Sequence, residues 1–136
     1  MSGARPATTA ELGAVLAANA AATQRRRVRI VGTGTRRQLV TDAPADALTV
    51  SLAALATIER LEPDDLTCSV QPGVRCRDLA DALAEKGLEL GGLRDDDVGT
   101  IGGLYAADPL GPAAPGAACP RSTLLGIEVV LADGTP

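Results

Sequence analysis

The chain contains two glycine-rich turns, far apart in sequence, whose composition suits a close approach of the backbone to an anion. The first comprises Val31, Gly32, Thr33, Gly34, Thr35 and Arg36. The second comprises Thr100, Ile101, Gly102 and Gly103. Because glycine has no Cβ, backbone N–H groups at such turns can converge on an anion. The pair predicts that one small domain binds a phosphate-bearing cofactor.

A structural interpretation of each glycine stays open at this point. Gly32 and Gly34 could simply form a tight exit from a strand, and Gly102 with Gly103 could allow a helix to pack closely. The acidic run at residues 95–97 could bind a cation, although consecutive carboxylates are usually just solvated. We therefore predict no metal site and assign no catalytic residue.

Composition excludes several classes of function. The formal net charge is −4 and histidine is absent, which excludes a Ser-His-Asp triad and a histidine-based metal site. Nucleic acid is not an expected partner, because clustered Lys and Arg bind phosphate backbones. The one basic run, residues 25–27, is interpreted as the solvated start of a strand. A length of 136 residues with 46% hydrophobic residues indicates one globular domain with a small core.

The number of cysteines and the shortness of the apolar segments indicate where in the cell the protein is expected. The 3 cysteines, an odd number without CxxC spacing, indicate reduced thiols in a cytoplasmic protein. No segment approaches the roughly 18 apolar residues of a membrane span. No signal peptide is visible either. We therefore expect a cytoplasmic protein without a membrane span.

The elements that would position the turns follow from periodicity, capping residues and turn residues. The expected helices cover residues 9–22, 75–86 and 101–107, the first capped by Thr8 or Thr9 and the second stopped by Gly87. The expected strands cover residues 28–31, 48–51, 88–90 and 124–131, and a hairpin joins residues 57–62 to 66–71. A single helical turn is expected at residues 52–54 and a tight turn at residues 132–134. The strand at residues 28–31 runs directly into the first glycine turn, which is the layout expected of a phosphate cradle.

The order of these segments resembles the N-terminal FAD-binding domain of the FAD-linked oxidases, the vanillyl-alcohol-oxidase or PCMH-type group. The segments that carry the resemblance are residues 31–35, 61–67, 70–74, 79–83, 100–103 and 125–134, in unbroken order. Within the group, the chain looks most similar to the FAD-binding small subunit of bacterial glycolate oxidase. The resemblance implies an α+β fold of two small α/β subdomains that hold FAD between them.

The resemblance also implies the cofactor contacts. Residues 31–36 would wrap the pyrophosphate of a non-covalently bound FAD with their amides. Arg36 lies where its charge could reach a phosphate, but its residue type and place favour an exposed loop arginine. Residues 100–103 would meet the pyrophosphate or the flavin from the other side, aided by the start of the helix that they open. Pro72 and Gly73 would shape the wall near the cofactor, and Gly73 is expected to be structural in any case. Arg121 matches the arginine of an Arg-Asp step in the family.

The resemblance finally implies a role and a domain organisation. We expect one truncated FAD-binding domain over residues 1–136, with residues 9–90 as the first subdomain and 91–136 as the start of the second. It would serve the flavin-dependent oxidation of a 2-hydroxy acid, be inactive alone, and form a homo-oligomer or dock on a partner oxidoreductase subunit. One alternative is a scaffold that no longer binds FAD, which Ser122 in place of the family's acid favours. Another is a binder of a simpler nucleotide that uses only the first turn.

Overall fold

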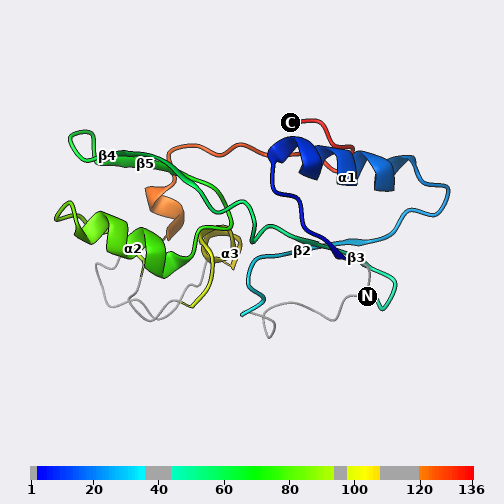
Figure 1. Ribbon diagram of the computed structural model, residues 1–136, viewed down its shortest axis with the longest axis horizontal. Helices are drawn as coiled ribbons and strands as arrows, with labels where there is room; N and C mark the ends of the chain where they lie inside the picture. The colour runs from blue at the N-terminus through cyan, green and yellow to red at the C-terminus, as the bar shows by residue number, and fades with distance from the viewer. Residues whose placement is uncertain (1–2, 36–43, 94–97, 108–119) are drawn as a thin grey trace.

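A computed structural model of the chain describes residues 3–35, 44–93, 98–107 and 120–136, in which short helices and strands are mixed. The elements are β1 (Gly3–Ala4), α1 (Thr9–Ala21), β2 (Val28–Val31), β3 (Leu48–Ser51), β4 (Ile58–Glu62), β5 (Thr67–Val70), α2 (Cys76–Ala84), α3 (Ile101–Ala107) and the 3-10 turn η2 (Pro120–Thr123). This mixture is compatible with the expected α+β class. Two groups of elements lie side by side, with α1 and β1 to β3 in one and β4, β5, α2 and α3 in the other (Figure 1).

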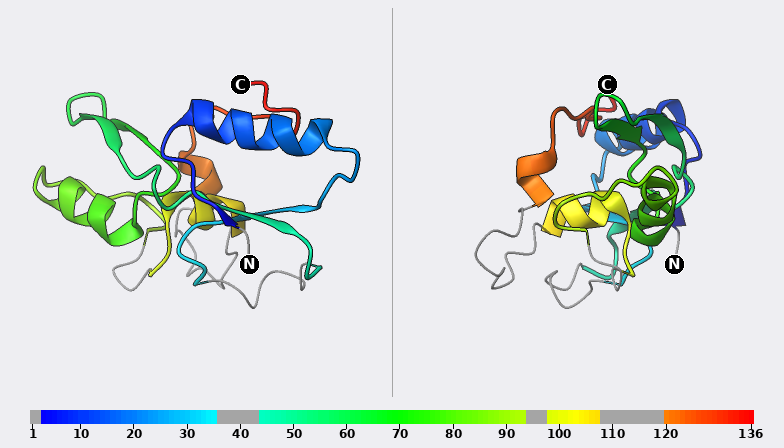
Figure 2. Two further views of the ribbon diagram at one scale, coloured as in Figure 1. Left: turned by 45° about the vertical axis from the view of Figure 1, so that its right-hand side comes forward. Right: turned by 90° about the vertical axis from the view of Figure 1, so that its left-hand side faces the viewer.

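The first group is a parallel sheet covered on one face by α1. Its strands lie in the order β1-β3-β2, with Val28 opposite Leu48 in the register of β2 and β3. Figure 2 shows α1 stacked over these strands from a second direction. Leu16 of α1 and Val50 of β3 are buried. Strand β1 was not expected from the sequence, because two residues carry no readable alternation.

Helix α1 has a defined beginning and a defined connection to β2. Thr8 accepts the Glu11 N–H on its Oγ1 at 3.1 Å, which confirms Thr8 as the cap. Near the other end, Asn19 Nδ2 donates to the Arg26 carbonyl at 3.0 Å and Asn19 Oδ1 accepts the Arg26 N–H at 3.2 Å. One side chain therefore fixes the end of α1 to the residues that lead into β2.

The second group contains the larger core. Strands β4 and β5 pair as the expected antiparallel hairpin, with Glu62 opposite Thr67. Helix α2 lies beside the hairpin (Figure 1). The buried core residues are Val74, Cys76, Leu79, Leu83, Ile101 and Leu104. Because α3 supplies two of these residues, it packs with α2. The domain boundary expected near residue 90 stays a prediction.

Two predicted strands are wrong. Residues 88–90 and 124–131 belong to no ladder in the described part of the chain. Alternating apolar residues favour a strand only where a neighbouring strand accepts the backbone hydrogen bonds. Leu88 and Leu90 instead pack half-buried against the core.

Residues 52–54 likewise form a simple turn, closed by the Leu55 N–H donating to the Leu52 carbonyl at 3.0 Å, and not a helical turn. The three helices and the remaining strands confirm the sequence expectations to within a few residues at their ends.

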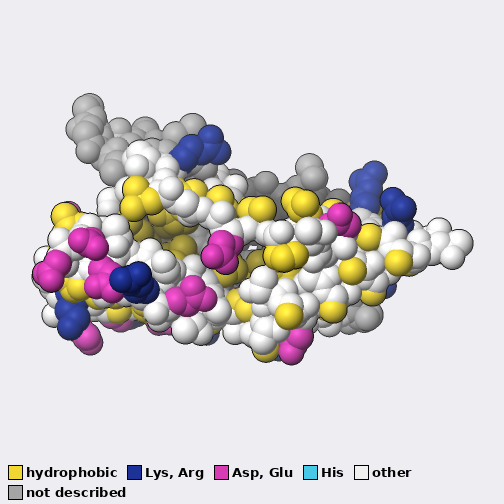
Figure 3. All heavy atoms as spheres, turned by 90° about the horizontal axis from the view of Figure 1, so that it is seen from above, with side chains coloured by type: hydrophobic (Ala, Val, Ile, Leu, Met, Phe, Trp, Pro, Cys, Tyr) yellow, Lys and Arg dark blue, Asp and Glu magenta, His cyan; other side chains and the backbone are white. Residues whose placement is uncertain are grey.

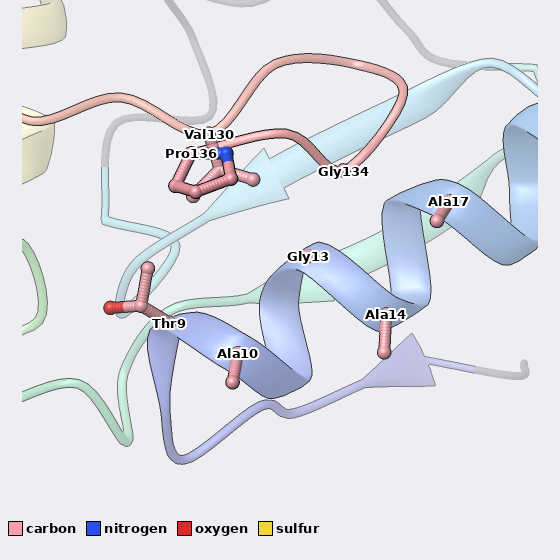
Figure 4. Close-up of a pocket in the computed structure, with 8 residues that line it drawn as sticks. All are labelled: Thr9, Ala10, Gly13, Ala14, Ala17, Val130, Gly134 and Pro136. Atoms are coloured by element: carbon pink, nitrogen blue, oxygen red, sulfur yellow. The ribbon is translucent and has the colours of Figure 1, made fainter.

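The last described segment returns to α1. It runs from η2 past the strands to the outer side of α1 (Figure 1), where the predicted turn at residues 132–134 is confirmed by the Gly134 N–H donating to the Leu131 carbonyl at 2.9 Å. A Cβ built on Gly13 would lie only 2.8 Å from the Gly134 carbonyl oxygen. The hollow beside this contact is lined by Thr9, Ala10, Gly13, Ala14, Ala17, Val130, Gly134 and Pro136 (Figure 4). Helix and turn thus approach closely because both carry glycine at the contact.

Candidate cofactor-binding site

The first glycine turn follows β2, and the main-chain N–H of Gly32 in this turn points to the open edge of the sheet. Leu48 N–H donates to the Arg27 carbonyl and Leu52 N–H donates to the Val31 carbonyl, each at 2.8 Å. In a parallel ladder, alternate residues of a strand bond to one neighbour. The odd-numbered residues of β2 therefore face β3, and Gly32 directs its N–H away from β3. Since β2 lies at an edge of the sheet, this N–H points toward space that no described strand fills.

Gly34 gives the first turn its shape. Its φ is +75°, a left-handed conformation that glycine adopts without the steric cost that a Cβ imposes. Thr33 and Thr35, on either side of it, are exposed. The turn therefore presents hydroxyl groups beside backbone N–H groups, and both are donors that suit phosphate oxygens.

The second turn commits most of its amides within the chain. Ile101 N–H donates to the Val74 carbonyl at 2.8 Å, and Gly102 N–H donates to the Pro72 carbonyl at 2.9 Å. Gly103 N–H donates to the Thr100 hydroxyl at 3.3 Å. The turn at residues 100–103 was expected to meet the pyrophosphate or the flavin. Because each of these three amides already has an acceptor, a direct part for them in cofactor binding stays a prediction.

The amide of Thr100 differs from its neighbours. Thr100 forms an antiparallel bridge with Arg75, and the bonds on either side of that pair are Cys76 N–H to the Gly99 carbonyl and Ile101 N–H to the Val74 carbonyl. A residue in such a pair directs its own N–H away from its partner. Thr100 is 2% exposed, and its N–H meets no acceptor among the described residues. A buried N–H without an acceptor costs about 1–3 kcal/mol, so this donor suits a ligand oxygen.

The two turns lie against each other. A Cβ built on Gly32 would overlap the Thr100 hydroxyl oxygen and would lie 3.1 Å from Thr100 Cγ2. Gly32 therefore touches the one residue of the second turn whose N–H is unused in the described part of the chain. The sequence predicted that segments far apart in the chain would act on one ligand, and this contact brings them together.

Comparison with known protein families decides which ligand this is. A family described as "FAD binding domain" matches residues 3–136, nearly the whole chain. The chain belongs to this family. It is a PCMH-type FAD-binding domain of the FAD-linked oxidoreductases, and FAD is its cofactor. A comparison with curated proteins found no match.

The residues present suit the diphosphate of FAD. The N–H groups of Gly32 and Thr100 are both directed away from their own ladders, and Thr100 side-chain atoms touch Gly32. The space at this contact depends on the absence of a Cβ at residue 32. An anion suits two N–H groups that are directed away from their own ladders on turns that touch each other.

Pro72 and Gly73 connect the two groups of elements in this FAD-binding domain. A Cβ on Gly73 would overlap the carbonyl oxygens of Leu52 and Leu55, and Gly73 N–H donates to the Leu55 carbonyl at 2.6 Å. A Cβ on Gly102 would lie 2.7 Å from Pro72 Cβ. These contacts support the close-packing interpretation of Gly73 and Gly102. Contact between Pro72 or Gly73 and the cofactor stays a prediction.

Contact of Arg36 and Arg121 with the cofactor stays a prediction. Arg36 is outside the described residues, as is the acidic run at residues 95–97. Arg121 is exposed on η2, which Thr123 holds against α3 through a 2.8 Å hydrogen bond between the Thr123 and Tyr105 hydroxyls. Thr123 also donates to the Pro120 carbonyl at 2.7 Å, so the Tyr105 hydroxyl is the donor in that pair.

Other chemistry is sparse in the part of the chain that the structure describes. Burial raises the pKa of the Cys68 thiol above its usual value, so this thiol is protonated near neutral pH and is not an activated nucleophile. The described residues bring no three His, Cys, Asp or Glu side chains into a metal-binding group. No helix in the described ranges is both long and apolar enough to cross a membrane.

Proposed function

We propose that the domain holds FAD non-covalently, with the diphosphate between residues 32–35 and the N–H of Thr100. The observation that carries this proposal is the main-chain N–H of Thr100. It has no acceptor among the described residues, and it belongs to a buried residue whose side chain touches Gly32. The exposed hydroxyls of Thr33 and Thr35 supply further donors. A site of this kind recognises the diphosphate by main-chain donors and needs no basic side chain.

We also propose that the domain serves an oxidoreductase that acts on a 2-hydroxy acid. The support is the resemblance of the segments at residues 61–67, 70–74 and 125–134 to the small subunit of glycolate oxidase. FAD, when bound, would accept the hydride that leaves the substrate. The described residues supply position and hydrogen bonds for the cofactor, and none of them is assigned to the substrate. The domain alone is therefore expected to be inactive and to work with a partner oxidoreductase subunit or a second copy, in the cytoplasm.

Ligand titration of the apoprotein tests the proposal. FAD and ADP, which share the diphosphate, are expected to bind, and FAD should bind at least about tenfold more tightly. Riboflavin lacks the diphosphate and is expected to bind at least about a hundredfold more weakly than FAD. Equal binding of riboflavin and FAD would contradict the diphosphate site, and equal binding of ADP and FAD would favour the simpler nucleotide binder.

Anaerobic addition of glycolate or lactate to the FAD-loaded domain should leave the flavin oxidised; bleaching would show that the domain is active alone.

A further inference from the structure

We propose that Thr100 is a positioning residue, whose side-chain size against Gly32 sets the separation of the two glycine turns. The proposal rests on the proposed diphosphate site between these turns and assigns a distinct task to one side chain of it. Thr100 acts on FAD binding through the position of its own main-chain N–H and the position of Gly32.

The contact with Gly32 leaves no room for a side chain at residue 32. A Cβ there would overlap Thr100 Oγ1 and would lie 3.1 Å from Cγ2 and 3.3 Å from Cβ of Thr100. With Thr100 only 2% exposed, its side chain cannot move into solvent to make space. The Thr100 side chain therefore fills the gap between the turns and fixes how closely they approach.

Thr100 is itself held in place by the second group of elements. Its hydroxyl accepts the Gly103 N–H at 3.3 Å, and its carbonyl accepts the Leu104 N–H at 2.8 Å. The bridge to Arg75 fixes its backbone on the other side. A β-branched side chain also has few rotamers to choose from. Thr100 is thus a rigid spacer, carried by α3 and set against the end of β2.

The hydroxyl has its own partner in the Gly103 N–H, and the side chain faces Gly32. The main-chain N–H of Thr100 has no acceptor among the described residues, so it remains available to a ligand. Moving the side chain by the width of a methyl group would move this N–H relative to that of Gly32, and two donors on one diphosphate must keep a fixed separation.

A double-mutant cycle of Gly32→Ala and Thr100→Ala tests the spacer. Dissociation constants for FAD and the visible circular dichroism of the bound flavin are measured for wild type, both single variants and the double variant. Gly32→Ala is expected to weaken FAD binding by about tenfold or more in the wild-type background and by less than about threefold in the Thr100→Ala background. The reason is that Thr100→Ala removes Oγ1 and Cγ2 and leaves only the Cβ at 3.3 Å. The flavin spectrum should change in Gly32→Ala and return in the double variant, which a purely structural role would not produce.

Gly126→Ala is the matched control, because a Cβ at Gly126 meets no atom within 4 Å, and it should leave FAD binding unchanged. Equal weakening by Gly32→Ala in both backgrounds would overturn the spacer role. If Gly32→Ala alone does not fold, Thr100→Ala and the double variant carry the test. They should then bind FAD equally, and a tenfold difference would refute the proposal. If wild type binds no FAD, the proposed function fails separately, and the coupling is read from the melting temperatures of the four apoproteins.

Discussion

The role of each glycine at the site depends on the atoms that a Cβ would meet there and on the backbone φ angle. Gly32, Gly73 and Gly102 lie where a Cβ would strike atoms of another segment, whereas Gly34 is set apart by its positive φ. The sequence predicted the two turns, because glycine spacing after a strand is a local signal. It could not show that Ile101 and Gly102 give their N–H groups to residues 74 and 72, because those acceptors arrive only through tertiary folding. The task of Thr100 was hidden for the same reason.

Gly34→Ala should weaken FAD binding by at least about tenfold. A Cβ in the left-handed conformation costs roughly 1–2 kcal/mol per residue, and it would also narrow the turn that we propose binds the diphosphate. Gly87→Ala is the matched control, because Gly87 has a φ of +70° and open space around it at the end of α2. Both variants should lower the melting temperature by a few degrees, and only Gly34→Ala should change the FAD dissociation constant. Equal FAD affinity in the two variants would remove Gly34 from the site.

At the scale of elements, local signals were reliable and pairing signals were not. The capping threonine and the apolar spacing of Leu79 and Leu83 marked the helices α1 and α2. The apolar runs at residues 88–90 and 124–131 resemble strands by composition, yet strand formation depends on a neighbour that the run itself does not encode. The connection of α1 to the residues before β2 likewise depends on Asn19, whose hydrogen bonds to Arg26 are not encoded by the helical spacing of the sequence.

Asn19→Ala should destabilise the domain by about 1–3 kcal/mol, because both hydrogen bonds to Arg26 are lost. Asn19→Asp keeps the acceptor for the Arg26 N–H but loses the donor to the Arg26 carbonyl, so an intermediate loss is expected. Chemical unfolding monitored by circular dichroism measures both. If Asn19→Ala unfolds at the wild-type denaturant concentration, α1 is held by its apolar contacts alone.

On the scale of the whole molecule, apolar side chains are left open to solvent along the returning segment. Exposed fractions are 84% for Leu125, 72% for Ile127, 54% for Val129 and 52% for Leu131. Hydrophobic side chains are spread along the face seen from above in Figure 3, over both groups of elements. Ile30, at the open edge of β2, is 51% exposed. Several exposed apolar side chains along one segment favour association.

The isolated domain should therefore associate, with an apparent mass above the 13.7 kDa of one chain in sedimentation experiments. Ile127→Asp should lower that apparent mass, because a carboxylate would be desolvated in the contact. Leu66→Asp is the control, since Leu66 is 74% exposed at the tip of the hairpin and away from the returning segment. An equal effect of both substitutions would indicate non-specific aggregation and not a contact through residues 124–131.

The contact between Gly13 and Gly134 has a consequence for how the domain is made. A helix near the beginning of the chain is covered by a turn near the far end of the residues described. During translation, α1 leaves the ribosome long before Gly134 is synthesised, so this side of the helix stays uncovered until Gly134 has emerged. Closing so long a loop adds only a logarithmic entropy cost. The delay in covering α1, more than the entropy of closing the loop, is therefore the consequence of this contact for folding.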